Sequence, residues 1–278
     1  MTTPLPSRFA IIAGKGRYPL QLAESARRAG VAWIGAVAFR GETAESLAER
    51  VDALAWIGVG QLGRMIDTLC SWDVREAVMA GQITPGRLFR DARPDLRMVR
   101  LLAGLRRRNA ATIFGAIAAE LAGAGVVLAD SRRFLEDSLA RSGALGRRTP
   151  SRDLLSDLEY GFHLAKEMSR LDVGQTVVVK RGTALAVEGF EGTDEAIRRG
   201  AALGRGGAVV VKVSKPGHDV RFDVPVVGLE TLAVLREARV AALGLEAGHT
   251  IILDREEFIG RADAQRLVVY GLGGVDQP

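Results

Sequence analysis

The chain has 278 residues, 47% apolar and 26% charged, which is enough to bury the core of one large domain or two ordinary ones. Its formal net charge of +5 favours anionic partners but does not choose between nucleic acid, phosphorylated metabolites and anionic membranes. A single cysteine, Cys70, excludes an intrachain disulfide and a cysteine-based zinc cluster. Cys70 lies in the apolar pattern IDTLCSW and is expected to be buried. No signal peptide and no run of about 18 apolar residues is evident, so a cytoplasmic protein without a membrane span is expected.

The first half alternates short apolar runs with helical patterns. Strands are predicted at 8–16, 31–39, 53–57, 76–80 and 125–130, and helices at 19–29, 42–50, 61–71 and within 94–122. Such alternation is typical of βαβ units around a parallel sheet. We therefore expect an α/β fold with a Rossmann-like N-terminal domain over residues 1–137.

The second half begins after a basic, glycine-bearing segment at 138–150, which is the expected linker. Helices are predicted at 151–170, 194–203 and 229–239, and strands at 176–180, 183–188, 208–213, 250–253 and 267–270. Arg181-Gly182 has the composition of a hairpin turn between two of these strands. Residues 138–278 are therefore expected to form a mixed α/β domain.

Two N-terminal motifs allow either a binding role or a structural one. The turn GKGRYP at 14–19 follows a strand and precedes a helix, where backbone N–H groups can approach a phosphate. Pro19 replaces the third glycine of the dinucleotide fingerprint, so a structural turn is an equal alternative and NAD is disfavoured. The segment RMVRLLAGLRRRNA at 97–110 is a basic helical surface, either simply solvated or suited to phosphate or anionic lipid headgroups.

Two C-terminal motifs have the composition of a site for a phosphorylated ligand. In AVEGFEGTDEAI at 186–197, helix capping accounts for Thr193 and the acids that follow it, but not for Glu188 and Glu191. Acids at the carboxyl end of a strand are well placed to reach a ligand. In KVSKPGHDVRFDVPVVG at 212–228, closely spaced bases and aspartates suit a phosphate and Mg²⁺, although weak surface ion pairs are the alternative.

The long motifs of the second half resemble those of a known family. DVGQTVVVKRGTALAVEGFEGTDEAIRRG, KVSKPGHDVRFDVPVVGLETL and LEAGHTIILD are similar to the LpxI-type UDP-2,3-diacylglucosamine pyrophosphatases of lipid A biosynthesis. IIAGKGRYPLQLAESARRAG and DSRRFLEDSLARSGALGRRTPS extend the resemblance over almost the whole chain. His218 departs from the glutamine usual in the family, and Gly189-Phe190 from alanine-isoleucine.

The resemblance implies Mg²⁺-dependent hydrolysis of UDP-2,3-diacylglucosamine to UMP and 2,3-diacylglucosamine 1-phosphate (lipid X). It also implies two domains with the lipid held between them, and an essential aspartate in the R-F-D-V-P motif, which is Asp223 here. Together with the residue patterns, it gives these expected roles: catalytic for Asp223 and Asp219; metal-binding for Asp223, Glu188 and Glu191; substrate-binding for Lys212, Lys215, Arg221, His218, Thr193, Gln175 and Asp194.

The expected partners are the glycolipid nucleotide and the cytoplasmic face of the inner membrane, where the protein would be peripheral. A homodimer is compatible with the sequence, and no nucleic acid is expected, since no recognised module accompanies the basic segment and aromatic residues are only 5% of the chain. Two alternatives stay open: a non-catalytic lipid or nucleotide-sugar binding protein, and a Rossmann-type oxidoreductase. A histidine-rich metallophosphoesterase is excluded, because the chain has three scattered histidines.

Overall fold

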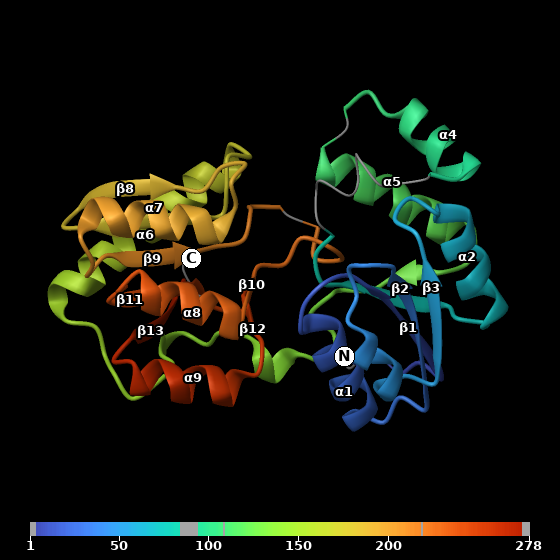
Figure 1. Cartoon of the computed structure of the whole chain (residues 1–278), viewed down its shortest axis with the longest axis horizontal. Helices are drawn as coiled ribbons and strands as arrows, with labels where there is room; N and C mark the ends of the chain where they lie inside the picture. Colours follow the sequence, from blue (N-terminus) through green and yellow to red (C-terminus); the bar gives the residue numbers. More distant parts are fainter. Residues whose placement is uncertain (1–3, 84–93, 108, 218, 274–278) are drawn as a thin grey trace. The chain divides into compact units, whose positions relative to one another are not determined.

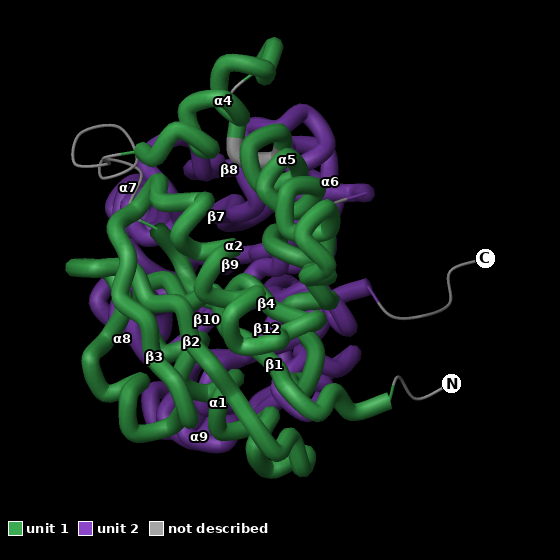
Figure 2. Tube along the Cα trace, turned by 90° about the vertical axis from the view of Figure 1, so that its right-hand side faces the viewer, with its two compact units in different colours: residues 1–135, 219–223 green, residues 136–218, 224–278 purple. Residues whose placement is uncertain are grey.

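The computed structural model describes residues 4–83, 94–107, 109–217 and 219–273. It divides into two compact units, shown in different colours in Figure 2. Unit 1 consists of residues 1–135 and 219–223, and unit 2 of residues 136–218 and 224–278. The sequence prediction placed the whole of 138–278 in the second domain, whereas the structure groups five residues of the charged loop with unit 1. The predicted domain limits stay a prediction, because compactness alone does not show independent folding.

Unit 1 is built on a five-stranded parallel sheet with the order β3-β2-β1-β4-β5 (Figure 1). Its elements are β1 (Arg8–Ala13), α1 (Tyr18–Arg28), β2 (Trp33–Phe39), the 3-10 helix η1 (Glu45–Arg50), β3 (Ala53–Ile57), α2 (Leu62–Ser71), β4 (Glu76–Ala80), α4 (Leu96–Gly104), α5 (Ala110–Gly123) and β5 (Val127–Leu128). The α/β class and the parallel sheet are thus confirmed, and the Rossmann-like description stays a prediction. The strand order reverses between β1 and β4, the place where α/β sheets usually bind ligands.

Helices pack on both faces of this sheet. Alternate residues of a strand point to opposite faces, and Ala10 and Ile12 of β1 lie in one core with residues of α2 and α5, such as Leu69 and Leu121. Helix α1 packs against β1, β2 and β4. The strands are therefore almost continuously apolar, as expected for a sheet covered on both sides.

Unit 2 contains a six-stranded mixed sheet with the order β6-β13-β11-β9-β7-β8 and a two-stranded parallel pair, β10 and β12. Strands β9, β11 and β13 are parallel, and β6, β7 and β8 supply the antiparallel pairings. The elements are η2 (Glu136–Ser138), β6 (Gly143–Ala144), α6 (Arg152–Arg170), β7 (Thr176–Lys180), β8 (Thr183–Val187), α7 (Thr193–Gly204), β9 (Val209–Lys212), β10 (Val226–Val227), α8 (Leu229–Glu237), β11 (Ala242–Glu246), β12 (Ile251–Ile252), α9 (Arg255–Ala264) and β13 (Val268–Leu272).

Period-two alternation divides the core of unit 2 into two layers. Val177 and Val179 of β7 pack with residues of α6, whereas Val178 between them packs with residues of α7, α8 and α9 (Figure 1). The predicted hairpin at Arg181-Gly182 is confirmed, since both residues have positive φ, 51° and 67°. This arrangement leaves the carboxyl ends of β8 and β9 and the amino end of α7 at one edge of the sheet.

Several sequence predictions differ from the structure. Cys70 is exposed instead of buried, because it falls on the outer side of α2. The helix predicted at 42–50 is a 3-10 helix limited to Glu45–Arg50. Strand β11 was missed, although it is central in its sheet. Among the described residues, no helix is long and apolar enough to cross a membrane.

Candidate functional site

The turn after β1 is bonded at its start to a neighbouring chain segment. Gly14 N–H donates to the carbonyl of Ala80 at 2.8 Å and Lys15 N–H to that of Gln82 at 2.6 Å. A Cβ atom on Gly14 would lie 2.5 Å from the Gln82 carbonyl oxygen, so glycine is needed here for close approach to the neighbouring chain segment. These two N–H groups bond to protein and are not available to a phosphate, and a phosphate at this turn stays a prediction.

The tip of the charged loop forms one tight turn in unit 1. The Asp219 carbonyl accepts hydrogen bonds from Phe222 N–H at 3.1 Å and Asp223 N–H at 2.9 Å. The Asp219 carboxylate accepts from the backbone N–H of Arg221 and from its guanidinium, at 2.8 Å from Nε and 2.5 Å from the terminal nitrogen. This hydrogen bonding raises the pKa of Arg221. Asp219 and Arg221 therefore shape the turn that presents the half-buried Asp223.

Residues from the N-terminal sequence hold this turn in unit 1. Ser131 donates from its N–H and from Oγ to the Val220 carbonyl, at 2.9 and 2.6 Å. The buried Tyr18 hydroxyl in turn donates to the Ser131 carbonyl. The ring of Phe222 packs on that of Phe114, with 5.5 Å between centroids. The position of Asp223 is thus fixed on both sides of the turn by residues remote in sequence.

A second group of predicted residues gathers at one edge of the unit 2 sheet. Lys212 ends β9, Glu188 follows β8, and Thr193 begins α7. The ammonium of Lys212 donates to Thr193 Oγ1 at 3.2 Å, and Thr193 Oγ1 donates to Glu188 Oε1 at 2.8 Å. Gln175 N–H approaches Glu188 Oε2 at 3.3 Å. The Thr193 side chain makes no capping hydrogen bond, and the N-cap is Gly192, so the capping interpretation of Thr193 was wrong.

Lys212 is the electrostatic centre of this edge. Burial lowers the pKa of Lys212 below the ordinary lysine value, and the carboxylates of Glu188 and Asp194 offset only part of that effect. Within the described residues, Thr193 is the one hydrogen-bond partner of its ammonium group, which has three N–H donors. A desolvated cation with unused donors can bind a phosphate oxygen strongly.

A buried ion pair that the sequence analysis missed fixes the start of the charged loop in unit 2. Glu246, at the end of β11, accepts from Lys166 Nζ at 2.8 Å and from Ser214 N–H and Oγ at 2.6 and 2.7 Å. Lys166 also donates to the Ser214 carbonyl at 2.9 Å. Burial raises the pKa of Glu246, but these hydrogen bonds outweigh it, and the pKa lies below its usual value. The only sequence signal for Glu246 was its place at the end of β11, which was itself unrecognised.

The other predicted site residues are placed as follows. Lys215 makes an ion pair with Asp172 at 2.7 Å. Glu191 pairs with Arg199 at 2.6 Å, and hydrogen bonds from its own backbone N–H and from Arg199 lower its pKa. Asp194 is exposed in the first turn of α7. His218 lies outside the described residues.

The predicted site residues therefore form two groups, each within its own unit. Asp219, Arg221 and Asp223 lie together in unit 1, and Lys212, Thr193, Glu188 and Gln175 lie together in unit 2. In the part of the chain that the structure describes, no three His, Cys, Asp or Glu side chains are close enough to share a metal ion. Mg²⁺ does not need such a cage, because it is usually held by one or two carboxylates with substrate phosphates and water. The carboxylate oxygens of Asp223 suit this way of binding Mg²⁺.

Comparison with known proteins identifies the family. Residues 8–138 match the LpxI N-terminal domain and residues 141–270 match the LpxI C-terminal domain. The chain belongs to the LpxI family. A relative from Caulobacter vibrioides, named UDP-2,3-diacylglucosamine pyrophosphatase LpxI, is 30% identical over 98% of this chain and 99% of its own length. The resemblance seen in the sequence motifs is thus confirmed.

Solved structures add nothing to this assignment. The biotin carboxylase domain of the 2-oxoglutarate carboxylase from Hydrogenobacter thermophilus is 12% identical, with a TM-score of 0.27 over 65% of this chain and 36% of its own. The biotin carboxylase subunit of a pyruvate carboxylase is 13% identical, with a TM-score of 0.26 over 66% and 35%. Similarities this low support no conclusion about fold or function.

Proposed function

We propose that this LpxI-family chain hydrolyses the diphosphate of UDP-2,3-diacylglucosamine to UMP and 2,3-diacylglucosamine 1-phosphate in lipid A biosynthesis. The observation that carries the proposal is the match over nearly the full length of both chains to a relative named for that substrate. The local geometry supports it, because unit 1 holds an aspartate on a rigid turn and unit 2 holds a desolvated cation at a sheet edge.

In unit 1, Asp223 is the carboxylate that we assign to the reaction. It orients the attacking water or holds Mg²⁺, whose positive charge would offset the charge developing on the diphosphate. Asp219, four residues earlier, is bound to the Arg221 guanidinium. An ion-paired carboxylate is a poorer base and a poorer metal ligand, so we favour a shaping role for Asp219 over the catalytic role expected from the sequence.

In unit 2, Lys212 and Thr193 are the groups that we assign to phosphate binding. The ammonium group neutralises phosphate charge, and Glu188 orients the Thr193 hydroxyl by accepting a hydrogen bond from it. Glu188 and Glu191 as metal ligands, and Lys215, Arg221, His218, Gln175 and Asp194 as substrate-binding residues, stay predictions. We further propose that the protein works in the cytoplasm, peripherally at the inner membrane; a homodimer stays a prediction.

The test is hydrolysis by the purified protein with and without Mg²⁺, scored as UMP and 2,3-diacylglucosamine 1-phosphate. Wild type is expected to release both products only with the metal ion, and Asp223→Ala to release neither while keeping its fold. Asp67→Ala is the matched control, because Asp67 is an exposed aspartate on α2 of the same unit. Full activity of Asp223→Ala would refute the role of Asp223.

The two alternatives give different results in the same assay. A non-catalytic binding protein would retain the glycolipid but release no UMP with or without metal. An oxidoreductase would show a thermal shift with NAD or NADP and none with 2,3-diacylglucosamine 1-phosphate. Pro19 in place of the third glycine of the dinucleotide fingerprint argues against the oxidoreductase.

A further inference from the structure

Helix α4 has apolar side chains on its outward face as well as its inward face. Met98 is buried, and Leu101 and Leu102 pack against the unit 1 core. On the opposite side, Leu96 is 75% exposed and Val99 is 48% exposed. A surface helix normally turns polar residues outward, so solvation of a basic helix does not account for this face.

Arginines flank the exposed apolar residues. Arg100 is exposed one residue after Val99, and Arg106 and Arg107 are exposed just beyond the end of the helix. None of these three guanidinium groups makes an ion pair within the described residues. Leu96, Val99 and Arg100 are neighbours on one helical face because they are spaced three and four residues apart. We call Leu96, Val99, Arg100, Arg106 and Arg107 the α4 surface.

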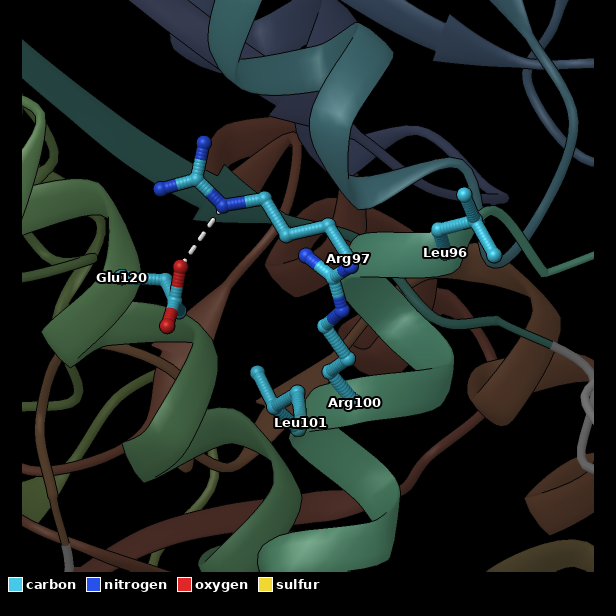
Figure 3. Close-up of a pocket in the computed structure, with 5 residues that line it drawn as sticks. All are labelled: Leu96, Arg97, Arg100, Leu101 and Glu120. Carbon is cyan, nitrogen blue, oxygen red and sulfur yellow. Dashed lines mark hydrogen bonds and ion pairs between the residues drawn. The ribbon is translucent and has the colours of Figure 1, made fainter.

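An open hollow of about 540 Å³ lies beside this surface and is lined by Leu96, Arg97, Arg100, Leu101 and Glu120, whose side chains are drawn in Figure 3. Arg97 reaches from α4 to Glu120 on α5, and the two make an ion pair at 2.7 Å. The N-cap residue of the helix, Asp95, accepts hydrogen bonds from Met98 and Gly63 N–H. Glu120 and Asp95 are therefore already bonded within the protein, and the arginines of the α4 surface are left to attract an external anion.

We propose that the α4 surface docks unit 1 onto a bilayer that contains anionic phospholipids. Apolar residues that enter the interface and arginines that attract headgroup phosphates are the two signals that together give stable peripheral binding. Duplex nucleic acid would use the arginines but offers no environment for exposed Leu96 and Val99. The proposal rests on the proposed function, whose substrate is a membrane glycolipid, and assigns a surface to the membrane contact.

The test is co-sedimentation of the full chain with vesicles of phosphatidylethanolamine and phosphatidylglycerol, and with vesicles of phosphatidylcholine alone. Wild type is expected to bind the anionic vesicles, and to bind less at high salt. Reversing the charge of Arg100, Arg106 and Arg107 to Glu should weaken this binding on the order of a hundredfold or more. Leu96→Glu with Val99→Glu should also weaken it, and that loss should persist at low salt.

The matched control is Leu203→Glu with Arg198→Glu on α7, where Leu203 is 65% exposed; it should bind like wild type. All three tryptophans lie in unit 1 (Trp33, Trp56 and Trp72). Their fluorescence therefore verifies that each α4 variant keeps unit 1 folded.

Several results would overturn the docking surface. The first three are no vesicle binding by wild type, equal binding to phosphatidylcholine vesicles, and vesicle binding that both folded α4 variants retain. The fourth is an α4 variant that loses a dimer but still binds vesicles. Loss of duplex DNA binding alone in the arginine variant would also overturn it.

Hydrolysis of detergent-dispersed substrate is measured in parallel and needs no bilayer. Vesicle binding without hydrolysis would therefore support the docking surface and refute the proposed function, whereas hydrolysis without vesicle binding would do the reverse.

Discussion

The substitution Glu246→Gln tests the buried ion pair at the start of the charged loop. Glu246 is 10% exposed at its side chain and Lys166 is 26% exposed. Glutamine removes the charge that balances Lys166 and replaces an acceptor oxygen with an NH₂ group. Breaking a buried pair costs roughly 3–5 kcal/mol, and partial exposure of Lys166 favours the lower end. We expect a loss of about 3 kcal/mol, or roughly 10 °C in the melting temperature of unit 2.

The pH dependence of this loss separates an electrostatic cause from a packing defect. The folded pKa of Glu246 is below its unfolded value, which is about 4.3 for glutamate. Its stabilising contribution is therefore complete above that pH and disappears as the pH falls through the folded pKa. Wild type and Glu246→Gln should accordingly differ fully at pH 7 and converge in acid. A stability difference that is the same at pH 7 and in acid would refute this reasoning.

The assay must report on unit 2. Circular dichroism follows both units, whereas fluorescence of the three tryptophans follows unit 1. We expect Glu246→Gln to lower the midpoint of the dichroism transition, and the fluorescence transition is recorded beside it to follow unit 1. Glu195→Gln is the control, because Glu195 makes an exposed pair with Arg198 in the same unit; such pairs contribute about 0.3–0.5 kcal/mol.

Two further substitutions test the Lys212 edge. Since the pKa of Lys212 is lowered, its ammonium group loses its charge as the pH rises. The value of kcat/KM should therefore decrease with rising pH, and this fall should begin below the ordinary lysine pKa of about 10.4. Lys212→Arg should move that fall to higher pH, and an unchanged profile would exclude Lys212 as its cause. Gly174→Ala would put a Cβ atom 2.1 Å from the Glu188 carbonyl oxygen, so we expect a loss of about 1–3 kcal/mol in unfolding experiments together with reduced activity. Gly115→Ala on α5, where nothing lies within 4 Å, should instead stabilise by up to about 1 kcal/mol.

The local pattern was sufficient to predict most elements, because buried strands such as β1 and β7 are rich in branched apolar residues. Strand β11 was missed since its sequence, ALGLE, has none of the β-branched or aromatic residues that indicate a strand. Its glycine is required by packing: a Cβ atom on Gly244 would lie 2.6 Å from Leu272 and 2.9 Å from Leu158. A tertiary constraint of this kind leaves no local signal.

The site was predictable where its residues are near in sequence and unpredictable where the fold joins distant ones. Glu188 and Thr193 were singled out together from one motif, and the structure brings them into contact. The pairing of Lys166 with Glu246 joins residues 80 positions apart, and no spacing rule applies to it. The grouping of residues 219–223 with unit 1 likewise depends on Ser131 and Phe114, which no spacing rule connects with the charged loop.

The charged loop combines the two explanations that its composition left open. Asp219 with Arg221, and Lys215 with Asp172, form the ion pairs that the structural interpretation expected. These pairs are partly exposed and contribute little stability each, but they set the path of the chain. Lys212 does not fit that interpretation, because its ammonium group is desolvated and bonds to a hydroxyl instead of a carboxylate. A purely structural loop has no need of such a cation, and a phosphate ligand would compensate its desolvation.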